Sequence, residues 1–237
     1  MTAFAASELG RIVQANQPVL CVDTCSVLDL LRDPFRETSL PHDAVAAVAM
    51  LRSMESGPTL IGLLAEQVQA ELGTHVADVA GEARRGLQKL RAHVARVDGL
   101  VSAFGPPVAT DLSAWANHVG SATTIVQRWT QASTVAPQSL AVQGRAFSRV
   151  MHAQAPARKG KDSLQDCVVL ETYLEAVGEL RRNGLAATVV FLSSNTNDYS
   201  ESSTKRSALH PGLIAEFAAL GIQYATGHGM AKAMLGL

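Results

Sequence analysis

The sequence predicts an α/β fold with a mostly parallel central sheet, because short apolar runs alternate along the chain with longer segments of helical spacing. Polar residues flank each apolar run, and short length together with β-branched side chains favours buried strands over helices. The expected strands are residues 18–22, 59–63, 187–192 and 221–224.

Four segments carry apolar residues at helical spacing and lie between these strands. The expected helices are residues 43–54, 64–79, 163–180 and 213–220, and the third has the strongest helical pattern in the chain. The last of them follows Pro211, which suits the first turn of a helix, and stops before Gly221. This order of strands and helices is typical of α/β proteins.

The middle of the chain, residues 81–157, is rich in alanine, compatible with helices and without a convincing strand. We interpret it as a helical arm inserted into a single domain that spans residues 1–237. Loops are expected at residues 105–107, where Gly-Pro-Pro interrupts the helical pattern, and around Pro156.

Composition excludes some classes of protein but does not identify the function. The 237 residues are 47% hydrophobic with a net charge of -1, so the chain can bury one substantial core and has no global basic field. No apolar run approaches the roughly 18 residues needed to span a bilayer, and no secretory leader is evident. We therefore expect a cytoplasmic protein that does not bind a membrane. Any polyanion would have to bind a local basic patch on its surface.

The cysteines indicate neither a disulfide framework nor a structural zinc site. Cys21, Cys25 and Cys167 are odd in number and lack the paired spacing of zinc ligands. We expect all three cysteines to be thiols that lie in the core or near the surface.

Acidic residues follow the predicted strands, at the edge of a parallel sheet where ligands collect. Asp23 comes directly after residues 19–22, Asp198 follows the strand at 187–192, and Glu71 lies on the helix after the second strand. Each also has a structural interpretation. Asp23 could cap the next helix, Glu71 could be solvated, and Asp198 could be a turn residue.

Asp166 is harder to explain structurally. At about 100° per residue it lies near the centre of the apolar stripe of its helix, whereas Glu171, Glu175 and Glu179 gather on the far side. An ionised carboxylate in that position costs several kcal/mol (about 3 or more) unless a partner compensates it. Asp162, one turn earlier, strengthens the expectation of a cation, although it could equally cap the helix.

Four acids brought to one sheet edge would repel one another, and the usual remedy is a divalent cation held by oxygen ligands. Mg²⁺ or Mn²⁺ fits such a set, and histidines with ligand spacing, which zinc would favour, are missing nearby. A bound metal of this kind lowers the pKa of water and stabilises charge on a phosphate. The residues thus favour phosphodiester chemistry.

Four segments resemble the motifs of PIN-domain nucleases. Residues 22–28 (VDTCSVL) resemble the first motif, and residues 68–72 (VQAEL) resemble the second. Residues 161–169 (KDSLQDCVV) and 191–199 (FLSSNTNDY) resemble the third and fourth. The order is that of the family, with an acid at each expected point. Cys25 stands where the family often has Asn.

The resemblance implies a PIN-like three-layer α/β/α sandwich and a Mg²⁺- or Mn²⁺-dependent phosphodiesterase, usually an endoribonuclease. By this likeness Asp23, Glu71, Asp166 and Asp198 would hold metal and water. Ser193 and Asn195 would organise the loop of Asp198 beside the substrate. The family also implies an RNA substrate, an antitoxin or regulatory protein as a partner, and a homodimer.

Residues outside these motifs are open to two interpretations. Lys159 and Lys161 precede Asp166 and could bind phosphates, or could belong to a solvated loop. Trp115 and Trp129 could stack on bases, but we favour a place in the helical core.

Two other functions remain open. One is a PIN-like module that binds RNA or protein without cutting. The other is an aspartyl-phosphate phosphatase, but Cys25 stands where its second Asp is required.

Overall fold

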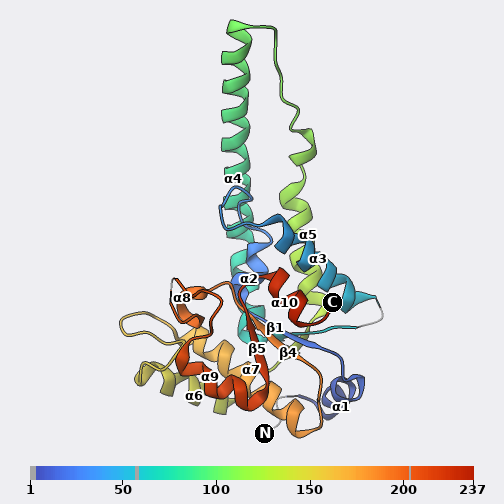
Figure 1. The fold of residues 1–237 in the computed structure, drawn as a ribbon, viewed down its shortest axis with the longest axis vertical. Helices are drawn as coiled ribbons and strands as arrows, with labels where there is room; N and C mark the ends of the chain where they lie inside the picture. The colour runs from blue at the N-terminus through green and yellow to red at the C-terminus, as the bar shows by residue number, and fades with distance from the viewer. Residues whose placement is uncertain (1–3, 57–58, 203) are drawn as a thin grey trace.

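The computed structural model describes residues 4–56, 59–202 and 204–237. A five-stranded sheet lies at the centre in the order β3-β2-β1-β4-β5, and every neighbouring pair of strands is parallel (Figure 1). The strands are β1 Val19–Val22, β2 Ile61–Ala65, β3 Thr134–Ala136, β4 Val189–Leu192 and β5 Ile222–Ala225. The predicted α/β class is confirmed.

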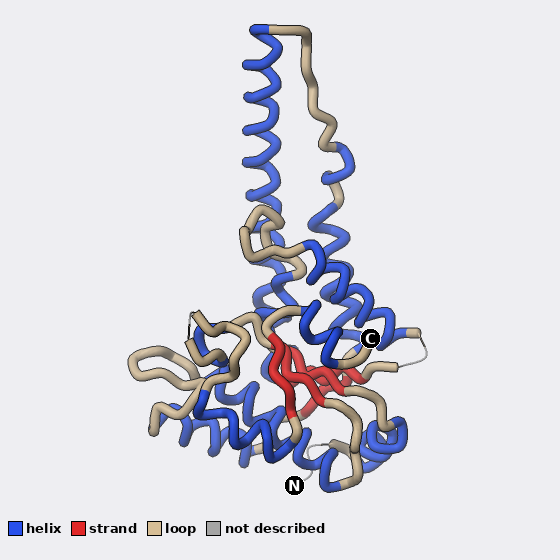
Figure 2. The backbone as a smooth tube through the Cα atoms, viewed as in Figure 1, coloured by secondary structure: helices blue, strands red, loops and turns tan. Residues whose placement is uncertain are grey.

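Helices cover both faces of this sheet, so that it forms the middle of three layers (Figure 2). On one face lie α1 Ala6–Ala15, α6 Leu140–Met151, α7 Leu164–Arg182 and α9 Pro211–Leu220. On the other lie α3 Pro41–Glu55, α5 His118–Ala132 and α10 His228–Met234. The remaining helical segments are α2 Thr24–Asp29, α4 Glu66–Phe104, α8 Thr196–Tyr199 and the 3₁₀ turn η1 Ser113–Trp115.

Tyr173 of α7 ties this helix to the sheet. Its hydroxyl donates to the carbonyl of Val22 at 2.6 Å and accepts from the backbone N–H of Ala65 at 2.9 Å. Strands β1, β2 and β4 are buried along their whole length, as expected for a parallel sheet covered on both faces. Anchoring at Val22 brings the first turns of α7 beside the carboxyl end of β1.

The predicted strands and helices all occur, but several boundaries and one segment differ. β2 extends to Ala65, where a helix was predicted to have begun, because Ala65 pairs with Ala136 of β3. The expectation that residues 81–157 contain no strand is wrong. β3 has three residues, too few to show a period of two in the sequence, and it forms by pairing with the free edge of β2.

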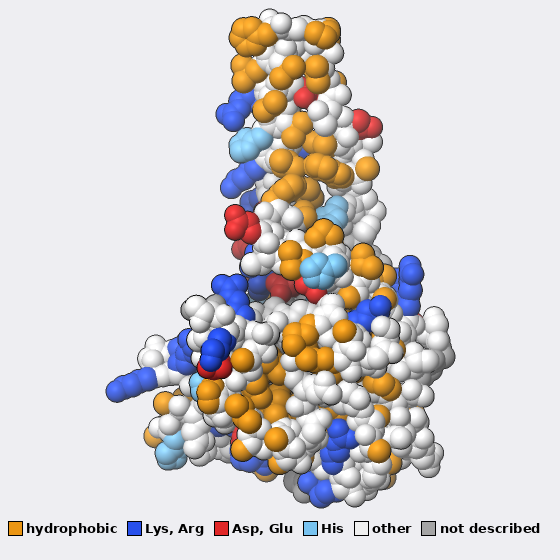
Figure 3. All heavy atoms as spheres, in the orientation of Figure 1, with side chains coloured by type: hydrophobic (Ala, Val, Ile, Leu, Met, Phe, Trp, Pro, Cys, Tyr) orange, Lys and Arg blue, Asp and Glu red, His pale blue; other side chains and the backbone are white. Residues whose placement is uncertain are grey.

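Part of the predicted arm projects from the molecule, and the rest of it belongs to the main body. α4 continues as a single helix to Phe104, and its second half rises from the body with residues 105–117 beside it (Figures 1 and 3). β3 and α6 return to the body. Trp129 lies in the core as predicted, whereas the core position predicted for Trp115 is wrong, since its side chain is 40% exposed on η1.

Within the described ranges, the helices are either too short or too polar to cross a membrane.

Candidate active site

Asp23 lies at the junction of β1 and α2, where the chain leaves the sheet. It is the N-cap residue of α2, and its Oδ1 accepts a hydrogen bond from the backbone N–H of Thr24 at 2.8 Å. The capping role considered from the sequence is therefore real, but it uses one carboxylate oxygen. The other oxygen, Oδ2, faces the end of the neighbouring strand β4.

Two side chains orient Asp23 Oδ2. Ser193, the first residue after β4, donates from its hydroxyl at 2.7 Å, and the thiol of Cys25 donates at 3.0 Å. Burial raises the pKa of Asp23, the hydrogen bonds from Cys25, Ser193 and Thr24 oppose this, and the charge of Glu71 adds to it. Cys25 and Ser193 thus fix the orientation of the Asp23 carboxylate.

Glu71 joins the same cluster through Thr24. The hydroxyl of Thr24 donates to Glu71 Oε2, while Gln67 Nε2 donates to Oε1 at 2.9 Å. Glu71 lies in the second turn of α4, just beyond the carboxyl end of β2. Both predicted acids of the first two strands therefore meet at the start of α2.

Asp198 comes from the loop and short helix α8 that follow β4, and its side chain is only 1% exposed. Oδ2 accepts hydrogen bonds from Asn195 Nδ2 at 2.6 Å and from the Lys161 ammonium. Oδ1 has no hydrogen-bond partner, although Arg158 Nε lies 3.3 Å away as an ion pair. Asn195 thus holds the acid of its own loop by a hydrogen bond.

Asp166 lies in the first turn of α7 and is partly exposed, with 24% of its side chain accessible. Burial raises its pKa to about 6, and the charges of Asp23 and Asp198 add to the rise, while Lys161 opposes it. Lys161 Nζ contacts both Asp166 and Asp198, and hydrogen bonds through Ser193 and Asn195 connect Asp23 with Asp198. The structure therefore brings Asp23, Asp166 and Asp198 together from three distant segments.

Lys161 lies inside this acidic cluster. Its Nζ is 3.5 Å from Asp166 Oδ2 and donates to Asp198 Oδ2. Burial alone would lower the pKa of Lys161, but the bond to Asp198 and the charge of Asp166 outweigh burial and raise it. From the sequence, Lys161 could bind phosphate or belong to a solvated loop, and in the structure its ammonium contacts Asp166 and Asp198.

Lys159 and Asp162, also expected near the site, are both exposed. Asp162 Oδ1 accepts a hydrogen bond from the backbone N–H of Leu164 at 3.4 Å, a contact of the kind made by residues that precede a helix. In the described part of the chain no hydrogen bond or ion pair joins Asp162 to the other acids. We place it outside the cluster.

The acids match a hard divalent cation in chemistry but are not yet arranged around one point. Carboxylate oxygens are the ligands that Mg²⁺ and Mn²⁺ prefer, and Asp198 Oδ1 is a buried oxygen without a hydrogen bond. Over residues 4–56, 59–202 and 204–237, no three His, Cys, Asp or Glu side chains are positioned to hold one ion. Lys161 carries the positive charge between Asp166 and Asp198 in this arrangement.

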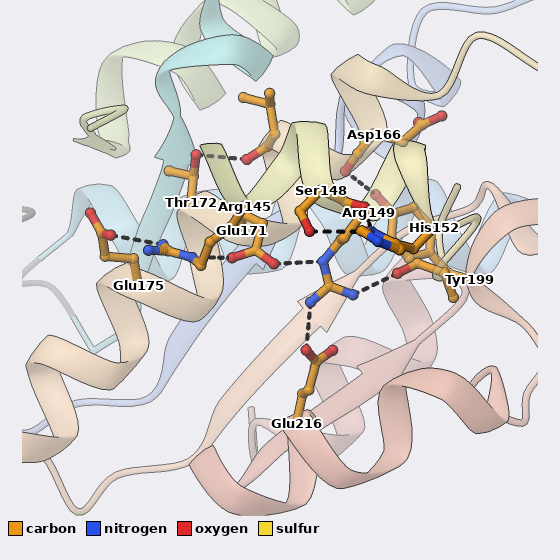
Figure 4. Close-up of polar contacts among 12 residues, drawn as sticks. Arg145, Ser148, Arg149, His152, Asp166, Glu171, Thr172, Glu175, Tyr199 and Glu216 are labelled. Carbon is orange, nitrogen blue, oxygen red and sulfur yellow. Dashed lines mark hydrogen bonds and ion pairs between the residues drawn. The ribbon is translucent and has the colours of Figure 1, made fainter. Parts of the chain in front are cut away.

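A buried ionic network supports the cluster from behind (Figure 4). Arg149 of α6 donates to Glu171 of α7 at 2.5 Å and to Glu216 of α9 at 2.6 Å. It also donates to the carbonyl of Ala155 at 2.7 Å. Ala155 lies in the loop between α6 and α7 that carries Arg158 and Lys161 to the acids, so this one guanidinium connects two helices with that loop.

The network also explains why α7 is buried on its charged side. Glu171 and Glu175, which the helical wheel placed opposite the apolar stripe, face α6 rather than solvent. Arg145 Nε donates to Glu171 at 2.5 Å, and its Nη2 donates to Glu175 at 2.8 Å (Figure 4). A wheel drawn for one helix cannot show a second charged helix that covers it.

The sequence reasoning missed one participant, Thr24, and one pairing, that of Arg158. Thr24 links Asp23 with Glu71, and Arg158 pairs with Asp198. For Thr24, a signal existed in its position directly after a strand-end acid, where a small hydroxyl at a helix start can reach a neighbour. The pairing of Arg158 depends on a loop path that no local pattern encodes.

A large surface cavity of about 840 Å³ adjoins the loop of Asp198 and is distinct from the cluster. Ser26, Ser194 and Asn197 are among its lining residues, and the four clustered acids are not. We base the site on the acids because their charges and hydrogen bonds converge elsewhere.

Comparison of the chain with models of known protein families, with curated proteins and with solved structures finds no match.

Replacing Arg149 by Met should lower the free energy of unfolding by about 3 to 5 kcal/mol, because Glu171 would lose a buried partner. Arg145→Met is the matched control. Arg145 bonds to the same glutamate but is 44% exposed, so its loss should cost about 1 kcal/mol or less. Urea denaturation of both variants measures the difference, and equal losses would show that the buried network does not depend on Arg149.

Asp166 should make stability depend on pH in a defined direction. Between about pH 4 and pH 6 the folded chain holds a proton on Asp166 that the unfolded chain releases, so stability falls as the pH rises through this window. In chelator at pH 7.5, Asp166→Asn should therefore be more stable than the wild type by about 2 to 3 kcal/mol. Thermal and urea unfolding across this range test it. A less stable variant would show that Asp166 is well compensated without metal.

Proposed function

We propose that this chain is a Mg²⁺- or Mn²⁺-dependent nuclease with a PIN-like fold that cleaves RNA. The observation that carries the proposal is the convergence of Asp23, Asp166 and Asp198 beyond the carboxyl ends of β1 and β4. Glu71 joins them through Thr24. These are the acids at which the four segments resemble the PIN motifs.

The charge of the cluster supports a bound cation. The pKa values of Asp23 and Asp166 are both raised, first by burial and then by neighbouring carboxylates. Lys161 supplies one positive charge to the group, and Arg158 pairs with Asp198 from the surface. A divalent ion would compensate the remaining repulsion and use the free lone pairs, including that of Asp198 Oδ1.

In the proposed reaction Asp23, Asp166 and Asp198 hold the cation, with Glu71 beside it. A divalent metal at this position supplies a water of lowered pKa and stabilises charge on the scissile phosphate. Ser193 and Cys25 keep Asp23 Oδ2 oriented, and Asn195 does the same for Asp198. Lys161, displaced from the acids, would turn its ammonium toward the phosphate.

A basic stripe on α4 supports a nucleic-acid substrate. Arg85, Lys89 and Arg96 are exposed, and no ion pair engages them in the described ranges. Lys89 follows Glu71 by 18 residues, which is five helical turns, so both lie on the same face of α4. Asp78 and Glu82 lie on this face between Glu71 and Arg85, so the three basic residues form a separate patch farther along the arm, where phosphates could bind without sequence preference.

A non-catalytic PIN-like binding module is the second candidate, and the position of Lys161 favours it. An ammonium placed between Asp166 and Asp198 neutralises acids that a catalyst would use for metal. In such a module Lys161 would stay in place, and RNA or protein would bind without being cut. Metal-dependent cleavage distinguishes the two candidates.

The test is cleavage of end-labelled single-stranded RNA and of DNA with the same sequence, in Mg²⁺, in Mn²⁺ and in chelator. We expect RNA to be cut only with metal. Asp166→Asn and Asp198→Asn should slow cleavage by at least about 100-fold, because each removes a charged ligand. Circular dichroism checks that both variants remain folded.

Asp162→Asn is the matched control, since it removes an exposed acid beside the cluster. It should cleave at the wild-type rate. Cleavage that persists in chelator or in Asp198→Asn would contradict the proposal, and RNA binding without any cleavage would establish the second candidate.

A further inference from the structure

The outer half of α4 exposes large apolar side chains that nothing in the described chain covers fully. Phe104 is 92% exposed and Leu100 is 58% exposed, and Val97 and Val101 are about half-exposed. Figure 3 shows hydrophobic side chains gathered along this side of the arm. Contiguous exposed apolar surface of this kind marks an interaction site more often than scattered single residues do.

Val97, Val101 and Phe104 belong to a regular repeat. Apolar residues follow one another at alternating spacings of three and four, the pattern of a helix that packs along another helix. The residues are Leu87, Leu90, Val94, Val97, Val101 and Phe104, which we call the arm seam. Towards the body the same repeat continues at Ala80 and Ala83, which are buried where α5 packs against α4.

The chain itself does not supply a helix for the arm seam. α5 begins only at His118, and Gly105, Pro106 and Pro107 prevent α4 from continuing or turning into a helix. Hydrogen bonds hold the segment that returns from the tip of the arm against α4. The backbone N–H of Thr110 donates to the Asp98 side chain at 2.7 Å, and that of Val108 donates to the Ser102 side chain at 2.8 Å. Asp98 and Ser102 lie to one side of the seam on the helical wheel, so its other side stays open.

We propose that the arm seam pairs with the arm seam of a second copy of this chain, in antiparallel orientation. A seam of this spacing fits a helix that carries the same spacing, and α4 is such a helix. The antiparallel register that aligns apolar layers sets Leu87 level with Phe104 of the second copy. The same register sets Leu90 level with Val101, and Val94 level with Val97.

A pocket at the base of the arm fits this register. It has a volume of about 410 Å³ and is lined by Leu87, Phe35, Trp115 and Ala114, among others. Phe104 of the second copy would reach the level of Leu87 and could fill it. The pairing occurs twice in the dimer because a twofold interface is self-complementary.

The length of the free arm agrees with the pairing. The loop after α2 meets α4 at Gly86, where a side chain would collide with Asp33, and Leu87 is the last buried residue of α4, so the body ends at Leu87. From Leu87 to Phe104 the helix measures about 25 Å at 1.5 Å per residue. Two antiparallel arms would therefore overlap over their whole free length and meet the partner's body at the tip.

The charges on α4 favour the antiparallel orientation. In a parallel pair, Arg84 and Arg91, which lie outside the basic stripe, would each lie level with the same residue of the second copy. In the antiparallel register neither is level with a basic residue, and Arg91 lies within two residues of the level of Asp98. Like charges at one level destabilise a pair and opposite charges stabilise it.

This inference does not depend on the proposed nuclease activity. The basic stripe is on the opposite side of α4 from the arm seam, so pairing would leave it accessible.

The oligomeric state tests the seam. Light scattering of the full chain at about 50 µM should give the mass of a dimer, and Val101→Asp with Phe104→Asp should give a monomer with an unchanged circular dichroism spectrum. Phe147→Asp is the matched control, since Phe147 is 59% exposed on α6, away from the arm. It should remain dimeric. A monomeric wild type, or a dimer that survives both arm substitutions, would overturn the proposal.

Cysteine cross-linking tests the orientation. A mixture of Leu90→Cys and Val101→Cys chains should form a disulfide-linked dimer under mild oxidation, whereas neither variant alone should do so. The wild type is the control for cross-linking through its own three cysteines. In a parallel pair each variant would cross-link to itself, and that result would overturn the antiparallel register.

Discussion

Compensation of negative charge at the carboxyl edge of the sheet is the constraint on which the structure of this site depends. Parallel pairing of β1 with β4 brings Asp23 and Ser193 together, and α7 adds Asp166 beside them. Burial makes each ionised carboxylate costly, and each raises the cost of the next. A cation must therefore accompany the cluster. In this structure Lys161 fills that role, and in the proposed reaction a divalent metal would take it over.

The layers behind the sheet edge hold the compensating groups in position. Tyr173 fixes α7 to the carbonyl of Val22, next to Asp23. On the other side of α7, Arg149 binds Glu171 and the carbonyl of Ala155, from which the chain continues to Lys161. The charged face of α7 and the cationic loop are thus connected through one buried guanidinium. Polar groups buried in this way stabilise the fold only while every partner remains in place.

Local patterns predicted most of the fold and the acids of the site, for identifiable reasons. Four strands are apolar runs that any sheet must bury, and Asp166 conflicts with the apolar stripe of its own helix. Long-range geometry determined what was missed. β3 is too short to show periodicity, the burial of Glu171 depends on Arg149 from another helix, and the place of Lys161 depends on the path of its loop.

Manganese binding tests the central claim most directly. Calorimetric titration of the wild type should show Mn²⁺ bound at one site per chain or at a close pair, and Asp198→Asn should remove that binding. Lys161→Gln should strengthen it by about tenfold or more, because the ammonium that competes for the same oxygens is gone. Binding that is weakened by Lys161→Gln, or unchanged in Asp198→Asn, would contradict the view that these acids share a cation.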